Sequence, residues 1–302
     1  MSYTWTNLVD DIKVRGMIPT NQSTYTPARL LNLTNAVMQS KVVPMVMRAR
    51  EGYYSYDFPF SITGALTGYA IPARAVGGKL ENVWFSDGQN HRQRAARYYE
   101  EDIEDYTINP NTEPGFFIKR NRIFPLPPSG TAQSWNTLEL TILMRPNQIV
   151  DPVTDAAQIT GISGNIATCS AGIPSSWATS STFDIIQDTD HFDWWAIDQT
   201  ITAISSTTIT FTSAIPSTVA VGDWIALARN SPIPQCPREF FPYLAQCTAN
   251  IVLRAQGDQN QVKAGEEEEK LLLESLVAVI TPRVEQEGKK IVSHSGIIRR
   301  RM

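Results

Sequence analysis

The sequence predicts an α+β fold: a helical bundle body built from the N- and C-terminal helices, with β-hairpins and an inserted Ser/Thr-rich β-sandwich or barrel-like module. Three observations predict it. Apolar residues recur at helical spacing near both ends of the 302-residue chain, and alternate with polar ones from about 53 to 146. From about 151 to 232, Ser and Thr are dense and charge is sparse. We therefore predict a helical and β body (1–150 and 233–282), an inserted β domain (151–232) and an extended C-terminal arm (283–302).

The N-terminal segment predicts two helices. In residues 4–15 the apolar side chains fall on one helical face, and Gly16 follows as a stop. Thr26 is a suitable N-cap for the second helix, with Pro27 at its first position. Pro44 lies inside the second pattern, so we expect the helix to kink or end there.

The next segment predicts strands. YYSYDFPFSI alternates as a half-buried strand does, and TLELTILMRP predicts a strand closed by Pro146. Two apolar runs around Gly77-Gly78 predict a hairpin, and GFFIKRNRIFPL predicts another with its turn near Lys119–Arg122. RQRAARYYEEDIEDYT begins basic and ends acidic, and we expect it to be partly helical.

The chain repeats one pattern about forty residues apart. Ile159–Pro174 reads ITGISGNIATCSAGIP and Ile201–Pro216 reads ITAISSTTITFTSAIP. Each copy predicts two short strands joined by a turn. Since two copies are too few for a solenoid, we expect a small sandwich or barrel in which each copy covers the apolar face of the other.

The C-terminal segment predicts two further helices. Pro237 is expected early in the first, which Gly257 ends. Asp258 with Gln261 resembles a capping box for the second, and Thr281-Pro282 should stop it.

Charge and motifs exclude several function classes. The net charge of −4 argues against binding nucleic acid by overall charge. The three cysteines and three histidines lack metal-ligand spacing, and neither a phosphate loop nor a nucleophile elbow is present. We therefore expect no enzyme, with no catalytic, cofactor-binding or metal-binding residues. No apolar run approaches bilayer length and the N-terminus lacks a signal pattern, so we expect synthesis in a host cytoplasm.

Three charged segments each allow two interpretations. GEEEEK at 265–270 is an exposed face, or the wall of a conduit on which carboxylates avoid binding passing DNA. Arg299–Arg301 is a solubilising end, or an anchor on an acidic partner. Arg92–Asp105 is a solvated helix, or a segment whose basic and acidic ends face different neighbours in a ring.

Most of the chain resembles a known family. YDFPFSITGALTGYAIPARAVGGKLENVWF, GFFIKRNRIFPLPP and LELTILMRPNQIV, followed by the Ser/Thr-rich insertion and PREFFPYLAQCTANIVLRAQGD, look like tailed-phage head-to-tail connector proteins, the portal adaptors. This resemblance implies a ring, commonly dodecameric, that lies beneath the portal and continues the DNA channel. Residues 22–50 and 236–280 would then form the ring body, 283–302 would reach the portal, and the insertion would project outward or toward the tail.

The resemblance also implies partners and sites. The partners are the portal protein, tail or nozzle proteins and copies of this chain, with DNA passing without sequence-specific binding and no membrane or cofactor. The location is the virion, at the head–tail junction. The candidate portal contacts are Ile297, Ile298, Arg299, Arg300 and Arg301. The candidate channel-facing residues are Glu266, Glu267, Glu268 and Glu269. The candidate inter-subunit residues are Arg92, Arg94, Arg97, Glu100, Glu101 and Asp102.

One alternative remains open. The chain could be a β-rich virion fibre or carbohydrate-binding module, in which Trp177, Trp194, Trp195 and Trp224 stack on sugars. The flanking helices discriminate between the two hypotheses, since a fibre protein should be β throughout and trimeric.

Overall fold

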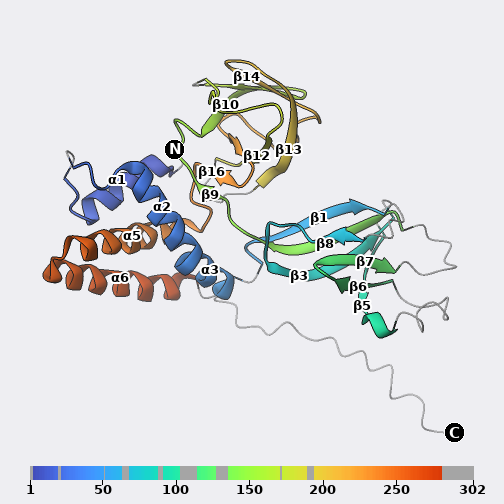
Figure 1. The fold of residues 1–302 in the computed structure, drawn as a ribbon, viewed down its shortest axis with the longest axis horizontal. Coiled ribbons are helices and arrows are strands. Elements are labelled where there is room, and N and C mark those ends of the chain that lie inside the picture. The colour runs from blue at the N-terminus through green and yellow to red at the C-terminus, as the bar shows by residue number, and fades with distance from the viewer. Residues whose placement is uncertain are drawn as a thin grey trace, which may run out of the picture.

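The computed structural model describes residues 3–19, 22–50, 52–62, 68–87, 91–102, 114–126, 135–170, 172–188 and 194–280. Three parts make up an elongated molecule, with a helical unit at one end, a β-wing at the other and a barrel above the point where they meet (Figure 1). The helical unit consists of α1 (Trp5–Arg15), α2 (Pro27–Val37), the π-helix η1 (Met38–Val42), α3 (Val43–Ala49), the 3-10 turn η3 (Arg238–Phe240), α5 (Phe241–Gln256) and α6 (Gln259–Ile280).

The wing consists of β1 (Ser55–Ser61), β2 (Tyr69–Ala70), β3 (Ala75–Ser86), β4 (Arg92–Arg94), β5 (Ala96–Arg97), the 3-10 turn η2 (Glu100–Asp102), β6 (Gly115–Lys119), β7 (Arg122–Leu126) and β8 (Thr137–Met144). The barrel consists of β10 (Ala156–Ser163), β11 (Ile166–Cys169), β12 (Thr182–Ile186), β13 (Trp194–Ile204), β14 (Thr208–Phe211) and β15 (Trp224–Leu227). Beside the barrel, β9 (Gln148–Ile149) pairs in parallel with β16 (Asn230–Ser231).

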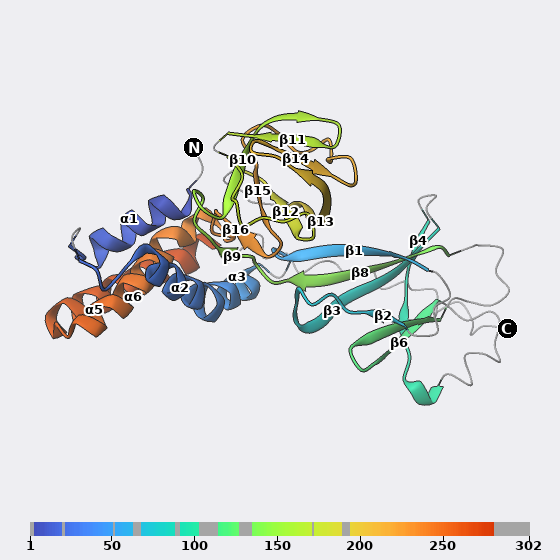
Figure 2. The same ribbon diagram turned by 45° about the horizontal axis from the view of Figure 1, so that its top comes forward.

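The predicted fold class is wrong, because the protein is mostly β and has no helical-bundle body. The alternating segment from 55 to 144 does not form hairpins that pack against the helices. It builds two four-stranded sheets, ordered β1-β8-β3-β4 and β2-β7-β6-β5, around an apolar core of their own. Figure 2 shows these sheets extending away from the helices. The helices are therefore one of three parts, not the framework of the whole molecule.

Within the helical unit, segments from the two ends of the chain pack together. Helix α5 contacts α1, α2 and α6, and Leu8, Val46 and Leu244 are fully buried in their shared core. The predicted helix ends are confirmed at two positions. The Thr26 side chain accepts a hydrogen bond from the Arg29 N–H, and Gly257 follows α5 with a left-handed φ of 83°.

The helix through Pro44 neither ends nor runs on as a regular α-helix. The π-helix η1 precedes the proline, and the Val43 N–H donates to the Met38 carbonyl, five residues back. Because proline has no N–H and its ring crowds the preceding turn, the wider π turn lets the chain stay helical into α3.

In the wing, strands β1 and β8 and the β6–β7 hairpin are confirmed. Arg120 and Asn121 take positive φ in the hairpin turn, as its two-residue geometry requires. The predicted hairpin at Gly77-Gly78 is wrong. Both glycines take positive φ, but they lie within the single strand β3, where the register with β8 shifts between Ala75 and Leu80. The glycines thus mark a bulge and not a reversal.

The repeated sequence builds a closed barrel ordered β10-β11-β14-β13-β12-β15. Each copy forms a hairpin, β10–β11 and β13–β14, and the two hairpins join where Ala167 pairs with Ile209. Phe183 and Phe211 lie in the barrel core. The barrel closes where Ala156 pairs with Ala226, so the strands on which the chain enters and leaves the barrel are neighbours.

None of the helices within the described ranges combines the length and the apolar character that crossing a membrane requires.

Candidate functional site

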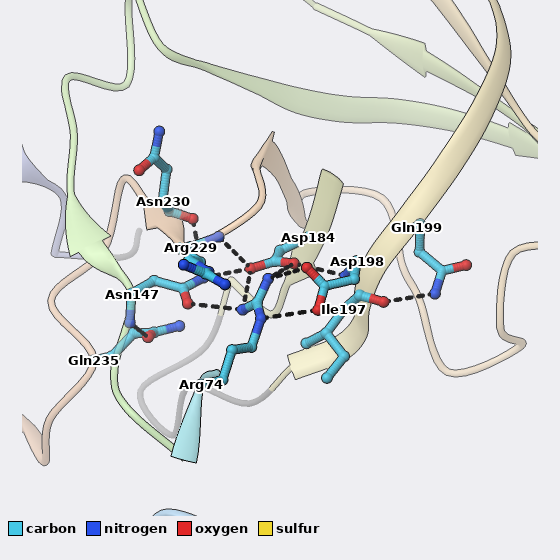
Figure 3. Close-up of polar contacts among 9 residues, drawn as sticks. All are labelled: Arg74, Asn147, Asp184, Ile197, Asp198, Gln199, Arg229, Asn230 and Gln235. Carbon is cyan, nitrogen blue, oxygen red and sulfur yellow. Dashed lines mark hydrogen bonds and ion pairs between the residues drawn. The ribbon is translucent and has the colours of Figure 1, made fainter. Parts of the chain in front are cut away.

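A buried polar cluster joins the wing to the barrel (Figure 3). Arg74 comes from the turn before β3, and its side chain is only 3% exposed. Its Nη1 and Nη2 donate to the two oxygens of Asp184 in β12, each at 2.8 Å. Its Nε and Nη2 also donate to Asp198 in β13, at 3.0 and 2.7 Å. One guanidinium therefore holds two barrel strands against the wing.

Asp184, which is fully buried, is saturated with donors. From described residues its oxygens accept five hydrogen bonds: two from Arg74, one from the Asn147 side chain and two from the backbone N–H groups of Asp198 and Arg229. A buried carboxylate is tolerated only when it is paired and hydrogen-bonded in this way. Its bonding is thus complete within the chain.

Asn147 extends the cluster toward the helical unit. Its side chain donates to the Asn230 carbonyl at 3.1 Å, and its N–H donates to the side chain of Gln235, just ahead of η3. Burial opposes the charge of Arg74, but its hydrogen bonds to Asp184 and Asp198 outweigh that effect and raise its pKa. Arg74 therefore stays charged, and the cluster acts as a fixed cross-link between the parts.

Sequence reasoning missed this cluster. One signal was available: Asp184 interrupts the apolar run Phe183-Asp184-Ile185-Ile186, and a carboxylate inside a buried strand requires a cationic partner. The identity of that partner, Arg74, had no local signal.

The four candidate channel glutamates lie on α6, and three of them have cationic partners within the chain. Glu266 pairs with Arg254 at 2.9 Å, Glu268 with Arg15 at 2.5 Å and Glu269 with Lys41 at 2.6 Å. Glu267 is exposed and has no ion pair with a described residue. The acidic run thus ties α6 to α1, η1 and α5, and its orientation toward a DNA channel stays a prediction.

Glu269 is the best-anchored member of the run. Burial opposes its ionisation, but hydrogen bonds from Lys41 and from Asn250, at 2.6 and 2.8 Å, outweigh burial and lower its pKa. Gly265 lies one turn away, where Asn250 donates to its carbonyl at 3.0 Å. A Cβ at this glycine would lie 2.3 Å from the Asn250 oxygen, so the close contact of α5 with α6 requires glycine there.

The candidate inter-subunit residues lie in the wing. Of the segment expected to be partly helical, the described residues form β4, β5 and the short 3-10 helix η2, and residues 103–107 lie outside the described ranges. Arg92 pairs with Asp57 at 3.0 Å and Glu139 at 2.8 Å, and it lies over the Trp84 ring at 4.6 Å. These contacts bind Arg92 to its own sheet.

The remaining candidates in the wing are exposed. Arg94 and Arg97 are exposed, as is Glu101, and Glu100 pairs with Lys119. The side chain of Asp102 and the candidate portal contacts Ile297, Ile298, Arg299, Arg300 and Arg301 lie outside the described residues.

The four candidate sugar-stacking tryptophans are all used in packing. Trp177 and Trp194 are each 6% exposed, Trp195 packs on the barrel core, and the Trp224 Nε1 donates to Asp188 at 3.0 Å. A stacking platform needs an open ring face. These side chains therefore give the carbohydrate-binding alternative no support.

Within the described ranges, no group of three or more His, Cys, Asp or Glu side chains is placed to hold a metal ion. Cys169, Cys236 and Cys247 are buried free thiols, and burial raises the pKa of Cys169 to about 11. Comparison with known proteins assigns no family: no protein-family model matches the chain, and no curated protein matches it.

Proposed function

We propose that this protein is a structural subunit of a virus particle, which forms a ring beneath the portal, joins the head to the tail and continues the DNA channel. The observation that carries the proposal is the surface of the helical unit. At the end of α1, Val14 is 79% and Met17 64% exposed, and near the end of α6, Val279 is 61% exposed. Exposed apolar groups that gather on one part of a surface mark protein contacts, whereas single ones are common on any surface.

The exposed apolar residues lie in two groups: Val14 and Met17 at the end of α1, and Leu271, Val277 and Val279 along α6. Glu268 holds Arg15 at the end of α1, and Val279 lies about 16 Å farther along α6 at the helical rise per residue. A closed ring with head-to-tail contacts needs two different patches on each subunit, one for each neighbour. The helical unit offers two such patches, which supports its place in the subunit contacts.

The rigid junction supports the same function. Arg74 and its partners fix the wing and the barrel to each other, so each copy in a ring would present both parts at the same angle. That geometry suits placement of partners and needs no catalytic group. The barrel then projects from the ring, outward or toward the tail, as the resemblance to portal adaptors implies.

The C-terminal arm provides the test. Removing residues 283–302 should abolish binding to the portal of the same virus, while the unfolding transition of the described parts stays unchanged. Pull-down with the portal measures the first, thermal unfolding the second, and negative-stain microscopy shows whether full-length protein and portal form rings. A full-length R299Q/R300Q/R301Q variant separates the basic charges from arm length. Unchanged portal binding by the truncated chain would show that the arm assignment is wrong.

The fibre alternative receives less support from the structure. A fibre subunit was expected to be β throughout, whereas helices from both chain ends build one of the three parts here.

A further inference from the structure

A cleft of about 470 Å³ opens in the wing beside strand β3. Six consecutive residues of β3, from Gly78 to Val83, line it. In this part of β3 the register with β8 shifts between Ala75 and Leu80 and again between Leu80 and Asn82, so consecutive residues of the bulged strand reach the same cleft. The lining also includes Arg94 and Ala95, which lie on the β4 side of β3, so the cleft runs along the side of this strand that faces away from β8.

Part of this edge has no partner strand within the described residues. On one side β3 pairs with β8, where Leu80 lies opposite Ile142 and Asn82 opposite Thr141. On the other side β4 pairs with Trp84–Ser86 and the Ala95 N–H donates to the Val83 carbonyl at 2.8 Å, so the stretch without a described partner runs from Gly78 to Asn82. An unpaired edge offers backbone donors and acceptors to an added strand, which is how several peptide-binding domains take an extended segment.

The cleft is also basic. Lys79, Arg94 and Arg97 line it, and none of the three has a carboxylate partner among the described residues. The one carboxylate in its lining, Glu81, accepts a hydrogen bond from the Ser55 hydroxyl at 2.9 Å. Apolar side chains complete the lining: Leu80, Val83, Ala95, Phe116 and Ile118. The cleft thus combines an open strand edge, unpaired cations and apolar contacts.

We propose that this cleft binds an acidic segment of a second copy of the chain, residues 100–108, EEDIEDYTI, which would bind in extended form although Glu100–Asp102 form the turn η2 in their own chain. This inference rests on the proposed ring, because it names one contact between neighbouring subunits. The segment carries five carboxylates within residues 100–105, and its Ile103, Tyr106 and Ile108 suit the apolar lining. In its own chain the segment begins at Glu100, which pairs with Lys119, and Lys119 does not line the cleft.

Charge selects this occupant over other extended segments. The three cations of the lining, Lys79, Arg94 and Arg97, favour an acidic strand and disfavour a basic one. The arm at 283–302, which is rich in Lys and Arg, is excluded on this ground. A DNA backbone would use the three cations but neither the strand edge nor the apolar lining.

Fluorescence anisotropy with a labelled peptide of residues 99–109 tests the proposal on the full chain at low salt. We expect saturable binding that an R94Q/R97Q variant weakens by at least about tenfold, since charge-assisted hydrogen bonds are lost. The matched control is R48Q/R50Q, which removes two exposed arginines of the helical unit and should bind as the unaltered chain does. Circular dichroism confirms that both variants fold.

Four outcomes would overturn the proposal: no saturable binding, equal binding of a peptide whose five carboxylates are amides, equal binding by R94Q/R97Q, or displacement of the peptide by a DNA oligonucleotide. A fifth outcome would place the segment in the cleft of its own chain. In this outcome, a monomeric full chain binds the peptide much more tightly after its own five acidic residues at 100–105 are replaced by Gln and Asn than it does before the replacement.

The failure of this contact and the failure of the ring are distinguishable. Rings formed with the portal by a chain that does not bind the peptide overturn the cleft contact alone. Peptide binding without rings in microscopy overturns the proposed function, and the segment contact would then describe a simpler association of two copies.

Discussion

The barrel and the wing are both built from antiparallel strands, but they manage their sheet edges differently. In the barrel, six strands close on themselves, and the last pairing, Ala156 with Ala226, leaves no open side. In the wing, two sheets share one core, yet β3 keeps an edge from Gly78 to Asn82 without a described partner strand. Closure removes edges, whereas an open sheet leaves hydrogen-bonding groups available.

This difference suggests a division of labour. A closed barrel has a fixed shape and few sites for strand addition, which suits a spacer or docking body. An open wing can add a strand from a neighbour, which suits contacts between subunits. The Arg74 cluster lies between them and holds the closed part against the open part.

Breaking that cluster should have the largest effect. Arg74→Ala leaves Asp184 buried without its cation, so we expect a loss of about 3–5 kcal/mol in the free energy of unfolding. Urea unfolding followed by fluorescence and by circular dichroism should also show separate transitions for barrel and wing. Arg145→Ala is the control, because that exposed side chain should change stability by less than about 0.5 kcal/mol. Equal, small effects of both substitutions would contradict a cross-linking role.

A matched pair of core substitutions compares the two β regions directly. Ile209 in the barrel and Ile123 in the wing are both fully buried. Ile→Val at either position should cost about 0.5–1.5 kcal/mol, because one buried methylene is lost. We expect both variants to lower the same unfolding transition, measured by urea denaturation, because the cluster couples the regions. Two transitions that respond separately would show that the barrel unfolds alone even with Arg74 present.

The smallest effect belongs to the helical unit. The lowered pKa of Glu269 gives stability that is present above its unfolded value near 4.5 and is lost as the pH falls through the folded value. Glu269→Gln should therefore lower stability by less than about 1 kcal/mol at pH 7, and this loss should shrink as the pH falls below the unfolded value. Urea midpoints of both chains at pH 7 and at pH 3 measure this. A deficit that stays the same size as the pH falls would contradict the assigned ion pair with Lys41.

The sequence predicted local elements better than their assembly. Thr26, Gly257 and the β6–β7 turn act over a few residues, where capping and turn chemistry decide the backbone. Gly77-Gly78 shows the limit: positive φ at both glycines serves a turn or a bulge equally well, and only the pairing of β3 with β8 decides. The fold class was wrong because alternation indicates strands but does not say that two sheets will bury each other.

Sites built from distant residues were hidden for the same reason. The acidic run on α6 was visible as charge, but its partners Arg15, Lys41 and Arg254 are brought to it by helix packing. The basic cleft of the wing likewise combines residues that are separated along the chain. The place of Arg97 in this cleft could not be predicted, because folding brings it beside residues of β3 and β6.

The chain enters and leaves the barrel on two neighbouring strands, and this affects how the barrel domain could be exchanged during evolution. Since β10 and β15 are neighbours, the whole insert could be exchanged between related genes through two nearby junctions without lengthening the host chain. After such an exchange, the buried Arg74 would have no carboxylate partners unless the incoming domain carried acidic residues at the positions of Asp184 and Asp198. Arg74 and Asp184, 110 residues apart, should therefore be gained or lost together among relatives of this chain.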